Sequence, residues 1–184
     1  WKIITKRKLF FNAYFFLILA FNYFVIVVYP KIYTWDSYYT LNELSIRYTD
    51  KPLLTGRNTI WAQLLDLISI KPWLGYGSGV LPEDFLTTSL SAHNLYLQIS
   101  LQVGIVGLFF LILFFLFIWR TFWIKRRDPK VVLVSCFFIG IIIHQTYEVT
   151  LTQNQFGIGL LQWIIIAFGL NYALKSINTK TELD

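Results

Sequence analysis

Two places in the sequence combine a charged or titratable side chain with the start of a segment that has helical spacing. Arg57 follows a glycine, where its guanidinium would join the free backbone N–H groups of a helix start in an anion site. His93 stands directly before Asn94, and either Asn94 or Ser91 can cap the helix that follows. A helix N-terminus disfavours the imidazolium form, so a neutral His93 is suited to act as a general base. A solvated loop arginine and a boundary histidine are the simpler interpretations.

A third candidate is the glycine-rich segment 71–79. Gly75 and Gly77 stand at alternate positions, where glycine lets the backbone turn tightly and approach a ligand closely. The segment lacks the ending of a phosphate loop and the dinucleotide-binding fingerprint. A tight turn at the membrane interface therefore explains these glycines at least as well as a substrate-binding loop does.

His144 and Glu148 form the fourth candidate, near the end of an apolar segment. Their spacing of four residues predicts that they share one helix face. Counted at about 1.5 Å per residue from Val131, His144 lies roughly 20 Å along the segment, toward the outside. Ionisable residues inside a membrane span usually face the helix bundle and mark function. Pairing between helices is the alternative interpretation.

Several classes of function are not expected. The sequence has one cysteine, two histidines and no cluster with metal-ligand spacing, so we predict no metal and no cofactor. The net charge is +6, but Lys and Arg flank apolar segments and form no patch on a soluble fold. We therefore expect no nucleic-acid partner.

The composition predicts an all-α, polytopic integral membrane protein. Hydrophobic residues make up 56% of the chain and charged residues 14%, against about 45–50% and about 25% in soluble domains. A membrane span needs about 20 apolar residues. Apolar segments of about that length predict four transmembrane helices, at residues 9–28, 94–119, 131–148 and 156–174.

The basic residues predict how these spans are oriented. Loop 120–130 is rich in Lys and Arg, the flank before residue 9 is also basic, and the short loop 149–155 has neither residue type. Basic short loops stay on the cytoplasmic side of a membrane. We therefore expect loop 120–130, the N-terminal flank and the tail 175–184 to be cytoplasmic, and loops 29–92 and 149–155 to be extracytoplasmic.

The long loop 29–92 is expected to be partly helical. Around residues 58–70, Trp61, Leu64 and Ile68 recur at helical spacing, and Pro72 ends the pattern. This amphipathic segment would lie on the membrane surface or pack on the spans, so we expect membrane lipids among the partners.

The order of these motifs resembles one known family. Residues 56–61 (GRNTIW), 71–77 (KPWLGYG), 92–98 (AHNLYLQ) and 102–108 (QVGIVGL) follow one another in the chain. This order resembles the C-terminal conserved domain of the bacterial O-antigen ligase and Wzy-type polysaccharide polymerase superfamily, over roughly residues 54–170. The HN pair and the later G-x-x-G are the most characteristic parts.

The resemblance implies a multi-pass glycosyltransferase of the bacterial plasma membrane, with its active loop outside. Such enzymes take a glycan from an undecaprenyl-pyrophosphate carrier and pass it to a hydroxyl of a glycan or lipid acceptor, without a metal or nucleotide sugar. Arg57 and His93 match the family's loop arginine and histidine, so we assign them catalytic roles. We assign substrate-binding roles to the other candidate residues, which are Asn94, Gly75, Gly77, Glu148 and His144.

Three alternatives stay open at the level of sequence. Polymerase and ligase share the same loop chemistry, and the sequence does not separate them. A transporter or flippase segment for a lipid-linked glycan is a second alternative. A truncated, inactive family member is a third, because the family usually has ten or more spans, the chain has no Met, and we expect N-terminal spans to be missing.

Overall fold

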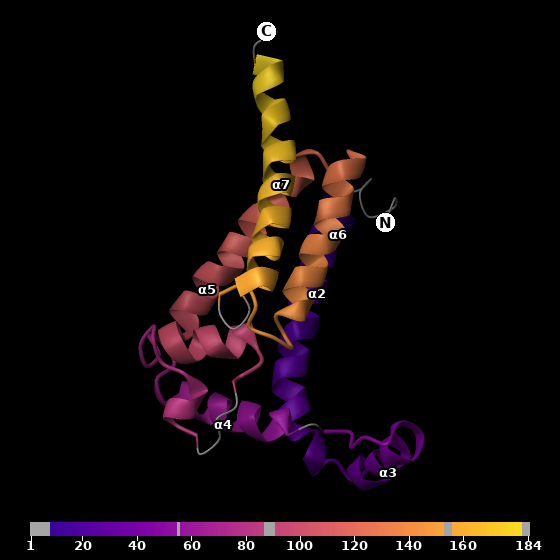
Figure 1. Ribbon diagram of the computed structural model, residues 1–184, viewed down its shortest axis with the longest axis vertical. Coiled ribbons are helices and arrows are strands. Elements are labelled where there is room, and N and C mark those ends of the chain that lie inside the picture. Colours follow the sequence, from indigo (N-terminus) through magenta and orange to yellow (C-terminus); the bar gives the residue numbers. More distant parts are fainter. Residues whose placement is uncertain (1–7, 55, 87–90, 153–155, 182–184) are drawn as a thin grey trace.

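The computed structural model describes residues 8–54, 56–86, 91–152 and 156–181, and these residues form helices and turns without a strand. Four long helices run lengthwise through the molecule (Figure 1). They are α2 (Lys8–Val28), α5 (Leu95–Ile124), α6 (Pro129–His144) and α7 (Phe156–Thr181). The predicted all-α class is confirmed.

Three helical segments are long and apolar enough to cross a membrane: Asn12–Thr34, Leu95–Ile124 and Phe156–Leu174. Helix α6 is apolar but has 16 residues, about 24 Å of helix against a hydrocarbon core of about 30 Å. In the described part of the chain, three helices that could span a membrane and one shorter apolar helix agree with the expected count of about four. The chain therefore has the build of a multi-pass membrane protein.

The two ends of the bundle differ in structure (Figure 1). One end holds the connection between α5 and α6 and the last turns of α7. The other end holds two helices of the long loop, α3 (Tyr38–Thr49) and α4 (Arg57–Ile70). Short 3-10 helices, η1 (Tyr29–Thr34) and η2 (Pro82–Asp84), complete this end, so the loop is partly helical, as predicted.

Helix α3 was not predicted. It buries no residue and projects sideways from the end of α2 (Figure 1). Asp50 ends the helix in a left-handed conformation, with its N–H bonded to the Ile46 carbonyl. The Leu53 N–H donates to the side chain of Asn42 at 2.9 Å, and this bond holds the turn that follows.

Two predicted segment ends differ from the structure. The helix predicted over 131–148 ends at His144. The Tyr96 hydroxyl of α5 donates to the Ile142 carbonyl at 2.8 Å, and the Thr146 N–H, which a continuing helix would pair with that carbonyl, donates to the Ile143 carbonyl instead. Helix α7 runs on to Thr181 and so takes in the first seven residues of the predicted tail 175–184, whose last three residues lie outside the described part of the chain. No glycine or proline interrupts residues 171–181, so the local sequence gives no reason for the helix to stop.

Helix α5 is broken at Gly104, whose backbone is not helical (φ 69°, ψ −168°). The glycine-rich segment supplies hydrogen-bond partners for the backbone groups around the break. Two N–H groups of that segment, from Tyr76 and Gly77, donate to the Leu101 and Gln102 carbonyls, both at 2.9 Å. In return, the N–H groups of residues 105 and 106 donate to the carbonyls of residues 72 and 73.

Glycine is required on both sides of this contact. Gly75 and Gly104 have positive φ angles, and a Cβ on either would overlap backbone atoms of the other segment. Around the contact, the side-chain amides of Gln98 and Gln102 both donate to the Val80 carbonyl, at 3.0 and 2.9 Å. The glycine-rich segment thus packs into the break of α5 and satisfies the backbone hydrogen bonds that the break leaves open.

Candidate active site

Asn94 fixes the position of the first turn of α5. Its side chain is fully buried; Oδ1 accepts from the Leu97 N–H at 3.0 Å, and Nδ2 donates to the Thr146 carbonyl at 3.0 Å. The Leu95 N–H donates to the Gln145 carbonyl at 2.8 Å. The predicted helix cap is present. Both ends of the Asn94 amide are therefore bonded inside the protein, and the residue holds the start of α5 against the turn after α6.

The backbone of His93 adopts a left-handed conformation, with φ +45°. This conformation costs a non-glycine residue on the order of 1 kcal/mol or more and persists only where neighbours enforce it. The His93 N–H donates to the Ser91 hydroxyl at 3.1 Å, and the buried Trp61 of α4 donates from Nε1 to the Ala92 carbonyl at 2.8 Å. Helix α4 and the α5 cap therefore hold His93 from both sides.

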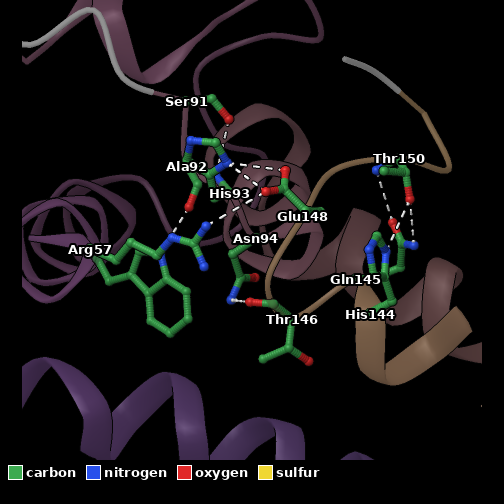
Figure 2. A network of polar contacts seen from close by, with 11 residues as sticks. Arg57, Ser91, Ala92, His93, Asn94, His144, Gln145, Thr146, Glu148 and Thr150 are labelled. Carbon is green, nitrogen blue, oxygen red and sulfur yellow. Dashed lines mark hydrogen bonds and ion pairs between the residues drawn. The ribbon is translucent and has the colours of Figure 1, made fainter. Parts of the chain in front are cut away.

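Three side chains from distant parts of the chain meet at this point: Arg57, His93 and Glu148 (Figure 2). We call them the catalytic cluster, after the role that is proposed for this site below. The His93 Nδ1 lies 3.0 and 3.1 Å from the two carboxylate oxygens of Glu148. Arg57 Nη2 lies 3.6 Å from Glu148 Oε1. Each side chain is about one third exposed, at 33%, 32% and 29%, so a substrate can reach all three.

The Glu148 contact selects one form of the neutral imidazole. A carboxylate accepts hydrogen bonds, so the proton of neutral His93 belongs on Nδ1. Nε2 is then the nitrogen that can take a proton from a substrate. Meanwhile Arg57, at the first residue of α4, places a permanent positive charge at a helix N-terminus. The cluster thus offers a proton acceptor beside an anion-binding group.

The prediction that His144 and Glu148 share one helix face is wrong. Helix α6 ends at His144, and Glu148 follows in a turn. The Glu148 side chain points to His93, whereas His144 lies on the other side of the turn, with its Nδ1 3.4 Å from the Thr150 hydroxyl (Figure 2). The structure therefore brings Glu148, but not His144, to Arg57 and His93.

The neighbours of His144 form a second polar group, which we call the amide cluster: Gln145, Thr150 and Gln162. They are 0%, 3% and 8% exposed. The Gln145 amide donates to the Thr150 hydroxyl at 3.0 Å and accepts from the Thr150 N–H at 3.2 Å, and the Thr150 hydroxyl donates to Gln162 at 3.0 Å. Sequence reasoning missed this cluster, although two glutamines in apolar segments signalled it.

A further buried contact, made by Asn22, lies next to the segments that carry the catalytic cluster. Asn22 of α2 is 2% exposed and donates to the Tyr96 hydroxyl at 3.2 Å. It also accepts from the Thr146 hydroxyl at 2.8 Å. This contact ties α2 to the start of α5 and to the turn that carries Glu148. An asparagine in the middle of an apolar span was the signal in the sequence for this contact.

The remaining candidate residues, Gly75 and Gly77, lie elsewhere. Their contacts are with residues 101–102 of α5, about 10 Å along the helix from its first turn. Among the residues that the structure describes, no three His, Cys, Asp or Glu side chains come together as metal ligands do.

Comparison with known proteins identifies the chain's family. The family described as O-Antigen ligase matches residues 1–112, more than half of the chain. The match includes Arg57 and His93 and ends within α5, so Glu148 lies outside it. No curated protein and no solved structure matches the chain. On the strength of the family match, the chain belongs to the O-antigen ligase family.

Proposed function

We propose that the protein transfers a glycan from an undecaprenyl-pyrophosphate carrier to an acceptor hydroxyl, outside the bacterial plasma membrane. Membership of the O-antigen ligase family supports glycan transfer in a membrane. The observation that carries the proposal is the catalytic cluster, where His93 and Arg57 share one carboxylate at an accessible position. A proton acceptor and a phosphate-binding cation are the two groups that this reaction requires.

Each step uses a group of the cluster. His93 Nε2 takes the proton of the acceptor hydroxyl as its oxygen attacks the anomeric carbon of the donor glycan. The bond from that carbon to the pyrophosphate oxygen breaks, and the pyrophosphate leaves with the electron pair. Arg57 stabilises the charge that develops on the phosphate oxygens, which a guanidinium can bind through two parallel hydrogen bonds.

Topology supports the proposed side of the membrane. The catalytic cluster lies at the end of the bundle opposite the basic connection between α5 and α6. Basic short loops favour the cytoplasmic side, so the cluster would face outside. Gly75 and Gly77 serve the proposed site indirectly, because they secure the outer part of α5, and Asn94 orients His93.

The proposal is tested by removing the phosphate-binding charge. Arg57→Ala in the complete protein should lower glycan transfer at least ~100-fold, because the leaving group loses its main stabilising charge. Arg47→Ala is the matched control, because it removes an exposed arginine of α3 from the same region, and it should keep wild-type transfer. Wild-type activity of Arg57→Ala would refute the assignment.

The products decide which of the alternative activities applies. A polymerase yields a ladder of chain lengths, whereas a ligase attaches one finished glycan to its acceptor. A transporter would move the lipid-linked glycan across the membrane without breaking its bond to pyrophosphate, and an inactive family member would do neither. The accessible His93 favours bond cleavage over transport, because transport needs no base.

A further inference from the structure

Glu148 contacts both of the other members of the catalytic cluster, but unequally. Its carboxylate is within hydrogen-bond distance of His93 through both oxygens, at 3.0 and 3.1 Å. The contact with Arg57 is longer, at 3.6 Å, which makes an ion pair without a short hydrogen bond. The Glu148 carboxylate is therefore hydrogen-bonded to the His93 imidazole and makes only a longer ion pair with the Arg57 guanidinium.

The Arg57–Glu148 pair is poorly placed to resist a competing anion. Both side chains are about one third exposed, and ion pairs at such exposure contribute little because water screens them. A pyrophosphate carries several negative charges and can bind a guanidinium through short, charge-assisted hydrogen bonds. Donor phosphate should therefore displace Glu148 from Arg57.

We propose that Glu148 neutralises Arg57 until the donor arrives and then serves His93 alone. The proposal rests on the proposed function and deepens it. Glu148 is a positioning residue, because it touches no reacting atom. The carboxylate accepts from His93 Nδ1–H and stabilises the imidazolium that forms when Nε2 takes the hydroxyl proton.

Such an exchange has two opposite consequences for the reaction. Before the donor binds, the carboxylate occupies Arg57 and repels phosphate, so it weakens donor binding. After the donor binds, the same charge keeps the imidazole oriented and favours proton transfer, so it raises turnover. Removing the charge should therefore tighten binding and slow the reaction at the same time, a combination that a merely structural residue does not produce.

The test is Glu148→Gln in the complete protein, a change that keeps the size of the side chain. Two quantities are measured: the Kd for undecaprenyl pyrophosphate in detergent, and kcat at saturating donor. We expect the Kd to fall about 5-fold, in keeping with a weak ion pair. We expect kcat to fall roughly 10–100-fold, a share of the usual effect of a positioned base.

Two controls separate this exchange from general effects of charge. Glu83→Gln removes an exposed carboxylate of η2 at the same end of the molecule and should change neither quantity. Undecaprenol, which has no phosphate, should bind the wild type and Glu148→Gln equally. Glu148→Asp keeps the charge, and its binding should stay within about twofold of wild type.

A Kd for Glu148→Gln that is unchanged or higher would overturn the proposal, whether or not kcat falls. Failure of this variant to fold would also overturn it, because it would assign Glu148 a structural role. Failure of the proposed function looks different: the wild type would transfer no glycan, while undecaprenyl pyrophosphate would still bind and Arg57→Ala would weaken that binding.

Discussion

The catalytic cluster and the amide cluster lie side by side at the C-terminal end of α6 (Figure 2), and one short segment, residues 144–150, contributes side chains to both. Glu148 reaches the first cluster, whereas Gln145 and Thr150 belong to the second. The first is charged and about one third exposed, and its ion pair is 3.6 Å long. The second is neutral and almost fully buried, and its groups bond to one another.

This difference separates a site from a structural contact. Buried polar groups that satisfy one another stabilise packing but have no hydrogen-bonding capacity left for a ligand. Accessible charges at a loose distance can exchange partners when a ligand arrives. The contrast therefore predicts that mutations in the catalytic cluster change activity without changing stability, and that mutations in the amide cluster do the reverse.

The largest effect is expected from His93→Ala. Loss of the base should lower kcat roughly 10²–10⁴-fold. The thermal unfolding temperature in detergent should stay close to wild type, because the imidazole is one third exposed. If His93→Ala also lowered the unfolding temperature, His93 would have a structural role, and the two clusters would not differ in the way proposed.

Gly104→Ala should give the next largest effect, this time on stability. The added Cβ would meet the backbone of Trp73 and Leu74, and the positive φ adds strain, so we expect a loss of about 2 kcal/mol or more. Gly140→Ala is the control, because a Cβ on Gly140 meets nothing within 4 Å. Equal unfolding temperatures for the two variants would show that the close contact between the glycine-rich segment and α5 does not stabilise the protein.

Gln145→Leu should destabilise the protein by about 1–3 kcal/mol. The substitution leaves buried partners of the amide unsatisfied, among them the Thr150 N–H and the Leu151 N–H. Glycan transfer per folded molecule should stay within about threefold of wild type, a change of less than about 1 kcal/mol in activation free energy. The check is unfolding temperature beside specific activity, and a selective loss of activity would place Gln145 in the site.

The sequence was informative where one segment decides its own structure. Apolar length indicated the spans, helical spacing indicated the segment 58–70, and Asn94 indicated a cap. The sequence contained no signal where contacts with a distant segment determine the local structure. Helix α6 stops at His144 where the Tyr96 hydroxyl of α5 takes the Ile142 carbonyl, and this end point separates His144 from Glu148. Local spacing carries no signal of that kind.

The two histidines of the chain give the most direct test, because His93 lies in the catalytic cluster whereas His144 is exposed and lies beside the amide cluster. The measurement is the rate of glycan transfer by His93→Ala and by His144→Ala, both in the complete protein at equal folded concentration. We predict a loss of at least ~100-fold for His93→Ala and a rate within about twofold of wild type for His144→Ala, since a change below 1 kcal/mol is small on this scale. Equal losses, or a larger loss for His144→Ala, would contradict the assignment of the catalytic cluster.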